Sequence, residues 1–203
     1  MVELARRFPL DGVARPGTNP EGVTPQVTLT VRNGVAHVLV LARKDRAAAV
    51  AAALGIGAEP GRASATDAFV ACPTAPGQWV VMADRGDDGG LSAMLRARLA
   101  DIGHVSEQSH GRQTVRIDGP RTRDVLARLC TLDLHPRVAG AGFCAQAPVA
   151  GIGCLVHQVD AAPTFDLVVY AGYAEAFWGR LTRTTAAFGY AVAVVRTGGD
   201  AAR

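Results

Sequence analysis

Short apolar runs alternate with segments of helical periodicity along the first half of the chain. These runs predict strands at residues 27–31, 35–41, 68–72 and 78–82, and helices at residues 44–54 and 91–102. The Asn33-Gly34 pair lies between the first two strands, and this dipeptide is typical of a tight hairpin turn. Gly55 and Gly103 follow the two helices and predict where each of them ends.

The second half repeats this order of elements. Its pattern predicts strands at residues 114–117, 143–149, 152–159, 165–170 and 190–195, and helices at residues 120–130 and 173–188. Each half therefore contains, in order, a strand, a helix, two or three strands and a helix. Helices that cover one face of an antiparallel or mixed sheet account for this order. We predict an α+β fold made of two structurally similar halves packed together.

Proline and glycine concentrate at the start of the chain, in residues 1–26. This composition predicts an extended N-terminal arm that makes no regular strand ladder. Such an arm could dock on another surface or remain a loose tail. The two halves then occupy residues 27–110 and 111–197, and residues 198–203 are expected to form a disordered tail.

Composition indicates a folded protein with a buried core. Apolar residues make up 49% of the chain and charged residues 19%, whereas disorder requires low hydrophobicity and high net charge. No apolar run reaches the roughly 18–20 residues of a membrane-spanning helix, and the first residues lack the apolar stretch of a signal peptide. The four cysteines lie within apolar segments, as expected for free thiols in a reducing compartment. We therefore predict a cytoplasmic protein that does not bind membranes.

The basic residues do not indicate nucleic-acid binding. The net charge is +3, and Lys44 is the only lysine among 21 basic residues. The arginines are spread along the chain among 18 acidic residues, whereas a nucleic-acid surface requires clustered positive charge. Arginine forms bidentate ion pairs better than lysine does, so this composition also suits a protein interface.

Three candidate catalytic or ligand sites are each weakly supported. Residues 140–145 match a G-x-G-x-x-A phosphate loop, but a strand is predicted where the motif requires a helix. The histidines and cysteines show no zinc-ligand spacing. Cys144, His135 and Asp133 could act as nucleophile, base and orienting acid, yet apolar neighbours disfavour the thiolate. We therefore expect no catalytic residue, no cofactor site and no metal site in this chain.

Two polar stretches remain that a hydrophobic core does not need, at residues 107–112 and 131–137. Both combine histidine, arginine and hydrogen-bonding groups with glycine or proline. Such residues suit a subunit interface, because arginine and flat polar side chains are common at protein contacts. The alternative is a solvated loop with an internal ion pair. The candidate interface residues are Ser109, His110, Arg112, His135 and Arg137.

The same stretches carry a family resemblance. The relevant segments are Ser-His-Gly-Arg at 109–112, Ile-Asp-Gly-Pro-Arg-Thr-Arg-Asp at 117–124, Leu-Asp-Leu-His-Pro-Arg at 132–137, Cys-Ala-Gln at 144–146 and Phe-Asp-Leu at 165–167. With the aromatic helix at 173–178, they resemble the gamma subunit of heterotetrameric sarcosine oxidase. The resemblance covers residues 104–190, and the first hundred residues agree only in general layout.

This resemblance implies a small subunit of a complex that oxidatively demethylates sarcosine to glycine, reduces oxygen to hydrogen peroxide and passes the one-carbon unit to tetrahydrofolate. It implies alpha, beta and delta subunits as partners, and it places FAD, FMN, NAD and zinc in those partners. It also implies a fold like the folate-binding domain of the glycine-cleavage T-protein. The resemblance carries over no catalytic residue, which favours a role in assembly.

A second function from a different class is a stand-alone folate-dependent one-carbon transferase. It would require a carboxylate directed at the folate pterin and an open pocket between the two halves. Glu107 and Asp133 are the candidate carboxylates. The support for this alternative is an analogy of fold alone.

Overall fold

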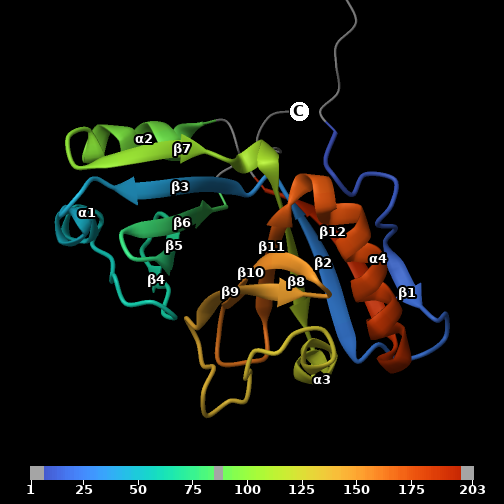
Figure 1. Ribbon diagram of the computed structural model, residues 1–203. Coiled ribbons are helices and arrows are strands. Elements are labelled where there is room, and N and C mark those ends of the chain that lie inside the picture. Colours follow the sequence, from blue (N-terminus) through green and yellow to red (C-terminus); the bar gives the residue numbers. More distant parts are fainter. Residues whose placement is uncertain (1–6, 85–88, 198–203) are drawn as a thin grey trace, which may run out of the picture.

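The computed structural model describes residues 7–84 and 89–197, which form two β-sheets with helices on their outer faces (Figure 1). The seven-stranded sheet contains, in spatial order, β1 (Gly17–Asn19), β12 (Tyr190–Arg196), β2 (Val27–Asn33), β8 (Arg112–Asp118), β11 (Phe165–Tyr170), β10 (Ile152–Gln158) and β9 (Cys144–Val149). The five-stranded sheet contains β4 (Ser64–Ala65), β5 (Val70–Ala75), β6 (Gln78–Ala83), β3 (Ala36–Ala42) and β7 (Gly103–Glu107). The predicted α+β class is confirmed.

Four α-helices and three short 3-10 helices accompany the sheets in the described residues. The α-helices are α1 (Ala47–Leu54), α2 (Gly90–Leu99), α3 (Thr122–Ala127) and α4 (Ala174–Thr185). The 3-10 helices are η1 (Ser109–Gly111), η2 (Ala171–Tyr173) and η3 (Ala186–Phe188). Every helix predicted from the sequence is present, but each is shorter than its pattern suggested because the capping turns share the apolar periodicity.

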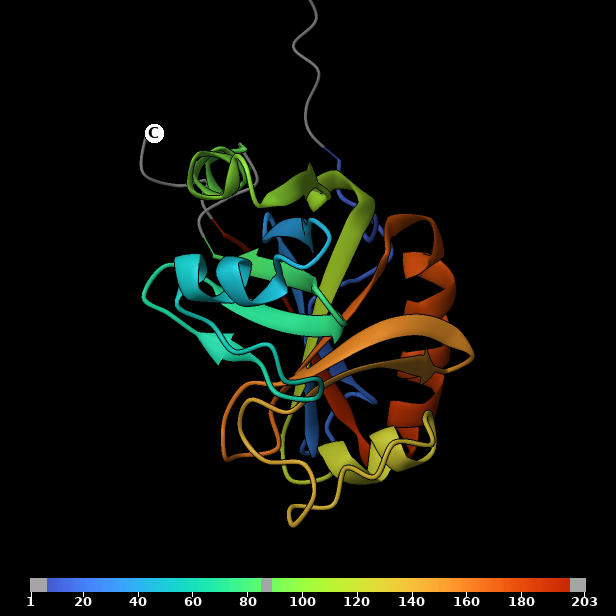
Figure 2. The ribbon, with the colours of Figure 1, turned by 60° about the vertical axis from the view of Figure 1, so that its left-hand side comes forward.

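The two sheets pack face to face, and their helices lie on the outside (Figures 1 and 2). Helices α3 and α4 share one apolar core with the seven-stranded sheet. Helices α1 and α2 share a second core with the five-stranded sheet. A third, smaller cluster joins the inner faces; its buried members are Val35, Cys72, Val80, Met82, Cys144, Leu155 and Val168.

The predicted hairpin at Asn33-Gly34 is wrong. Strand β2 pairs with β8 and β12, whereas β3 pairs with β6 and β7, so the chain crosses here from one sheet to the other. Gly34 has φ +80°, and a Cβ at this position would meet the Thr197 carbonyl oxygen at 2.6 Å. The chain therefore does turn at Asn33-Gly34, but the turn leads from β2 in the seven-stranded sheet to β3 in the five-stranded sheet. Strand β2 thus belongs to the sheet that is formed mainly by the second half.

The N-terminal arm packs against its own chain, in contrast to the expected absence of any ladder. Strand β1 pairs antiparallel with β12. Leu10 and Ala14 are buried in the same core as α4. The arm therefore covers part of the seven-stranded sheet. The predicted disordered tail at 198–203 lies outside the described residues.

Besides β1, the sequence pattern missed two strands, β4 and β7. Strand β7 lies at an edge of the five-stranded sheet, where His104 and Ser106 are exposed and Val105 is half-buried. An edge strand needs few apolar residues, because its pairing with β3 supplies the ladder. The apolar signal that identified the central strands is therefore absent here.

Helix α4 contains one residue that works against its stability. Gly179 is exposed in the helix interior, and a Cβ there would meet no atom within 4 Å. We expect Gly179→Ala to stabilise the fold by about 0.5–1 kcal/mol, because alanine restricts the unfolded chain and favours the helix. Urea unfolding of the two proteins measures this difference. Gly189→Ala is the control and should destabilise, because Gly189 has φ +67° and its Cβ would meet Val23 at 3.0 Å.

Candidate functional site

A buried cluster of charged side chains lies between the two sheets. Asp166 on β11 accepts hydrogen bonds from Arg32 Nη1 at 2.8 Å and from Arg116 Nε and Nη2, both at 2.8 Å. The exposed fractions of these side chains are 6% for Asp166, 10% for Arg32 and 29% for Arg116. Arg32 also pairs with the more exposed Asp84 at the end of β6. The cluster therefore balances two positive charges with two negative ones.

Strand register explains why these side chains meet. Arg116 lies directly opposite both Asp166 and Thr30, and Arg32 lies opposite Thr114, so all of them project from the inner face of the seven-stranded sheet. The hydrogen bonds from Arg116 to Asp166 raise the pKa of the Arg116 guanidinium. The sequence signal for this cluster was a single carboxylate inside an otherwise apolar strand, and Asp166 was not predicted as a site residue.

A cavity of about 390 Å³ borders this cluster. Its lining includes Arg32, Arg116, Asp166 and the imidazole of His157. His157 is 6% exposed, and its Nδ1 has no hydrogen-bond partner in the described part of the chain. Burial lowers the pKa of His157, so the ring is neutral at physiological pH. His157 is therefore a buried residue of strand β10.

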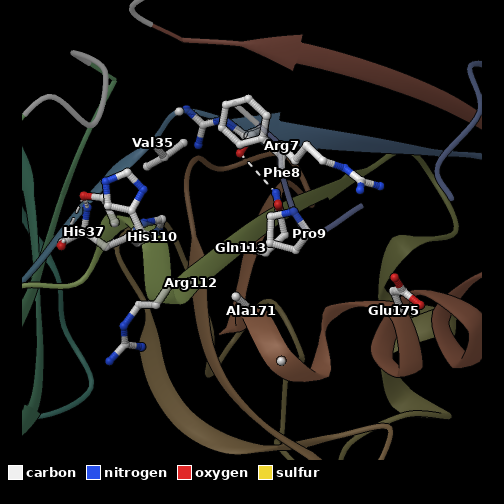
Figure 3. A pocket seen from close by; sticks show the side chains of 14 residues that line it. Arg7, Phe8, Pro9, Val35, His37, His110, Arg112, Gln113, Ala171 and Glu175 are labelled. Carbon is white, nitrogen blue, oxygen red and sulfur yellow. Dashed lines mark hydrogen bonds between the residues drawn. The ribbon is translucent and has the colours of Figure 1, made fainter. Parts of the chain in front are cut away.

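A second cavity, of about 520 Å³, brings together three of the five candidate residues (Figure 3). Ser109 and His110 come from η1, and Arg112 is the first residue of β8. The N-terminal arm contributes Arg7 and Phe8 to the lining. The cavity thus lies where the arm, η1 and η2 meet, at one end of the molecule.

Ser109 ties η1 to the five-stranded sheet. Its hydroxyl oxygen accepts a hydrogen bond from the His37 backbone N–H at 2.9 Å, and the hydroxyl donates to the Glu107 carboxylate. The same carboxylate accepts the Ser109 backbone N–H at 3.0 Å. Ser109 is 6% exposed, so these bonds are shielded from water. Its position indicates a structural clamp beneath the cavity rather than a contact on its rim.

The imidazole of His37 lies within 2.8 Å of the Thr114 hydroxyl through Nε2 and is 1% exposed. Burial, aided by the charge of Arg112, lowers the pKa of His37 to about 3. The folded protein therefore keeps this ring neutral while the unfolded chain binds a proton as the pH falls below 6.5.

His37 should make the fold sensitive to acid. Between pH 6.5 and pH 4.5, we expect the wild type to lose about 2–3 kcal/mol more unfolding free energy than His37→Gln, which has no proton to bind. Urea unfolding across this pH range measures the difference. His104→Gln, on the exposed strand β7, is the control, and its unfolding free energy should change with pH as the wild type's does. Equal slopes for the wild type and His37→Gln would contradict the burial of a neutral ring.

The other two candidates, His135 and Arg137, lie on an exposed loop near α3, at the opposite end of the molecule from η1 (Figures 1 and 2). The Asp133 carboxylate accepts the His135 N–H at 2.9 Å, and His135 Nδ1 accepts the Arg137 N–H at 3.2 Å. Leu134 anchors the loop in the core. The two polar stretches therefore do not form one site.

Arg123 holds this loop against the sheet. Its guanidinium donates to the Leu134 carbonyl oxygen and, at 3.4 Å each, to the Ala139 carbonyl oxygen and Gln158 Oε1. It also lies 5.3 Å from the centre of the Phe165 ring. Arg123 thus anchors the loop through two backbone carbonyl oxygens, while the side chains of Asp133 and His135 bond to backbone N–H groups within the loop.

The weak catalytic hypotheses find no support in the geometry. Residues 140–145 lead into strand β9, so no helix N-terminus is available for a phosphate. Cys144 is buried between the sheets beside Cys72, whereas His135 is exposed on its loop. The hydrogen bond between the two thiols raises the pKa of Cys72 and lowers that of Cys144. The proposed nucleophile and base are therefore not brought together.

The described residues contain neither a cluster suited to a metal ion nor a helix suited to crossing a membrane. In residues 7–84 and 89–197, no group of three or more histidine, cysteine, aspartate or glutamate side chains is arranged to hold a metal ion. Within the same ranges, no helix combines the length and apolar character that crossing a bilayer requires.

Comparison with known proteins identifies a family and a fold. A family described as "Sarcosine oxidase, gamma subunit family" matches residues 41–187. A chain of the heterotetrameric sarcosine oxidase from Corynebacterium sp. U-96, in complex with pyrrole 2-carboxylate, is 24% identical with a TM-score of 0.78; the match covers 90% of this chain and 96% of that one. No curated protein matches this chain.

A second solved structure extends the comparison of folds. The glycine cleavage system aminomethyltransferase T from Bartonella henselae is 16% identical with a TM-score of 0.59. The match covers 84% of this chain but only 48% of that protein, so this chain spans about half its length. The expected similarity to the T-protein fold is confirmed.

Proposed function

The chain belongs to the sarcosine oxidase gamma subunit family, and from this premise we propose that it is the small gamma subunit of a flavin-dependent, heterotetrameric sarcosine oxidase. In this role it contributes to assembly and holds no active site of its own. Its partners are alpha, beta and delta subunits, which carry FAD, FMN, NAD and zinc. The complex oxidises sarcosine to glycine, produces hydrogen peroxide and transfers the one-carbon unit to tetrahydrofolate.

The match of the family over residues 41–187 carries this proposal, because it includes strands of both sheets and both polar stretches. The surface supports it. Tyr170 and Tyr173, beside the η1 end of the molecule, are 53% and 60% exposed. Tyrosine with arginine nearby is typical of residues that anchor protein interfaces. The four free cysteines agree with assembly in the reducing cytoplasm.

No specific observation favours the stand-alone transferase. The two carboxylates that this hypothesis required are both engaged locally: Glu107 binds Ser109, and Asp133 binds the backbone of its own loop. Neither residue lines the 390 Å³ cavity or the 520 Å³ cavity. Titration of the isolated full-length chain with tetrahydrofolate should therefore show no binding, and saturable binding would revive the transferase.

A leave-out experiment tests the assembly role. The partner subunits are co-expressed with and without this chain, and both flavin content and sarcosine-dependent peroxide production are measured. We expect omission to lower the yield and thermal stability of the flavin-containing complex, while turnover per flavin in the surviving complex is unchanged. A loss of turnover per flavin with full yield would show that this chain takes part in the chemistry.

A further inference from the structure

Arg112 differs from Arg32 and Arg116, which share the inner face of the sheet, in having no acidic partner. It is 7% exposed, yet none of the salt bridges within residues 7–84 and 89–197 includes it. Its Nε donates to Gln108 Oε1 at 2.9 Å, and its guanidinium lies 4.7 Å from the centre of the Tyr170 ring. Buried charges are normally paired, because an unpaired charge loses its hydration without compensation.

Arg116 provides an internal comparison on the same strand and the same face. Its pKa is raised by Asp166, whereas the pKa of Arg112 is lowered, chiefly by burial. Glu175 is the one carboxylate among the described residues that line the 520 Å³ cavity. The Arg112 side chain points away from Glu175 (Figure 3). The positive charge of Arg112 is therefore not neutralised by the described part of this chain.

Arg112 also lines a smaller cavity of about 280 Å³, which we call the Arg112 cavity. Its other lining residues are Gln146, Ala147, Pro148, Gly153, Cys154, Leu155, Val168 and Tyr170. The volume is below the ~300–1,000 Å³ of typical small-molecule sites, so it suits an inserted side chain better than a cofactor. Tyr170 lies directly opposite Arg112 in the sheet and is half-exposed, which places an aromatic group at the rim.

We propose that an acidic side chain of a partner subunit inserts into the Arg112 cavity and pairs with the Arg112 guanidinium. A carboxylate matches the planar, bidentate geometry of guanidinium and supplies the counter-charge that this chain does not provide. The Tyr170 ring and the apolar walls exclude water from the pair, which strengthens it. The inference rests on the proposed role as a subunit and names the chemistry by which the partner is held.

The test measures how tightly the tagged full-length chain and its variants bind the remaining subunits, which are co-expressed without this chain. Arg112→Gln should weaken binding at least 30-fold, because truncating one member of a desolvated charge pair leaves the other charge buried. Arg112→Lys should weaken binding less, about 10-fold, because lysine keeps the positive charge but cannot form the bidentate pair with a carboxylate. The matched control is Arg128→Gln, since Arg128 is exposed and lies 4.5 Å from the Phe188 ring centre; it should stay within threefold.

The outcomes separate this inference from the proposed function. If the wild type does not bind the other subunits, the proposed function itself fails. If the wild type and Arg112→Gln bind equally, only the Arg112 pairing is wrong.

Melting of the isolated chain supplies a second readout: Arg112→Gln should leave Tm unchanged or raise it, because the charge is unpaired there. A marked fall in Tm with unchanged assembly would place the counter-charge within this chain. Stabilisation of the isolated chain by millimolar acetate, without any effect of Arg112→Gln on assembly, would identify a free carboxylate as the occupant. Either of these last two results would overturn the proposal.

Discussion

Replacing Asp166 by asparagine is expected to destabilise the fold by about 3–5 kcal/mol, because removal of one member of a buried ion cluster leaves its partners uncompensated. Asparagine has nearly the shape of aspartate but cannot neutralise Arg32 and Arg116, which both bind Asp166 at 2.8 Å. Arg32 would keep only the exposed Asp84. The difference is measured by urea unfolding of the isolated chain.

Asp124→Asn is the matched control for Asp166→Asn. Its carboxylate also pairs with an arginine, Arg121, at 2.5 Å, but both side chains are about half exposed, at 53% and 49%. Water and salt screen such a pair, so the control should lose no more than about 0–1 kcal/mol. If Asp166→Asn fails to fold, the milder Arg116→Met should still show a measurable loss. Equal, small losses for Asp166→Asn and the control would contradict a structural role for the buried cluster.

Gly119→Ala is expected to have the second large effect, a loss of at least about 2 kcal/mol. Gly119 connects β8 to α3 with φ +115°, a conformation that alanine rarely adopts. A Cβ at this position would meet the Gln26 carbonyl oxygen at 2.6 Å and the Val27 Cα at 3.0 Å. Both obstacles are backbone atoms at the start of β2, so relief would require the strand to move.

Gly140→Ala is the control for this substitution. Gly140 lies in the loop before β9, a Cβ there would meet nothing within 4 Å, and its φ is outside the positive region. Thermal melting of the two variants should show a large fall in Tm for Gly119→Ala and little change for Gly140→Ala. Similar Tm values would mean that β2 tolerates displacement at its first residue.

The central strands and all four α-helices of the described residues could be predicted from the sequence, because each buries an apolar face with the appropriate period. Pairing between strands could not. The Asn33-Gly34 turn is locally the same whether it closes a hairpin or directs the chain into another sheet, and only long-range contacts decide between them. Strand β7 was missed because an edge strand needs few apolar residues.

The candidate site was predicted only in part. Ser109, His110 and Arg112 do line one cavity, because η1 and β8 follow each other directly in the chain. His135 and Arg137 belong to a separate loop whose polar groups satisfy one another. The Asp166 cluster draws its members from β2, β8 and β11 and from the end of β6, which are far apart in sequence. No local spacing could have revealed it, although Phe-Asp-Leu did contribute to the family resemblance.

The most direct test of the proposed function is the visible absorbance of a complex purified through a tag on this chain after co-expression with the other subunits. The proposal predicts a yellow eluate that contains the larger subunits, with flavin absorbance in proportion to this chain and peroxide formed when sarcosine is added. A colourless, monodisperse single chain would contradict membership of a flavin-dependent complex.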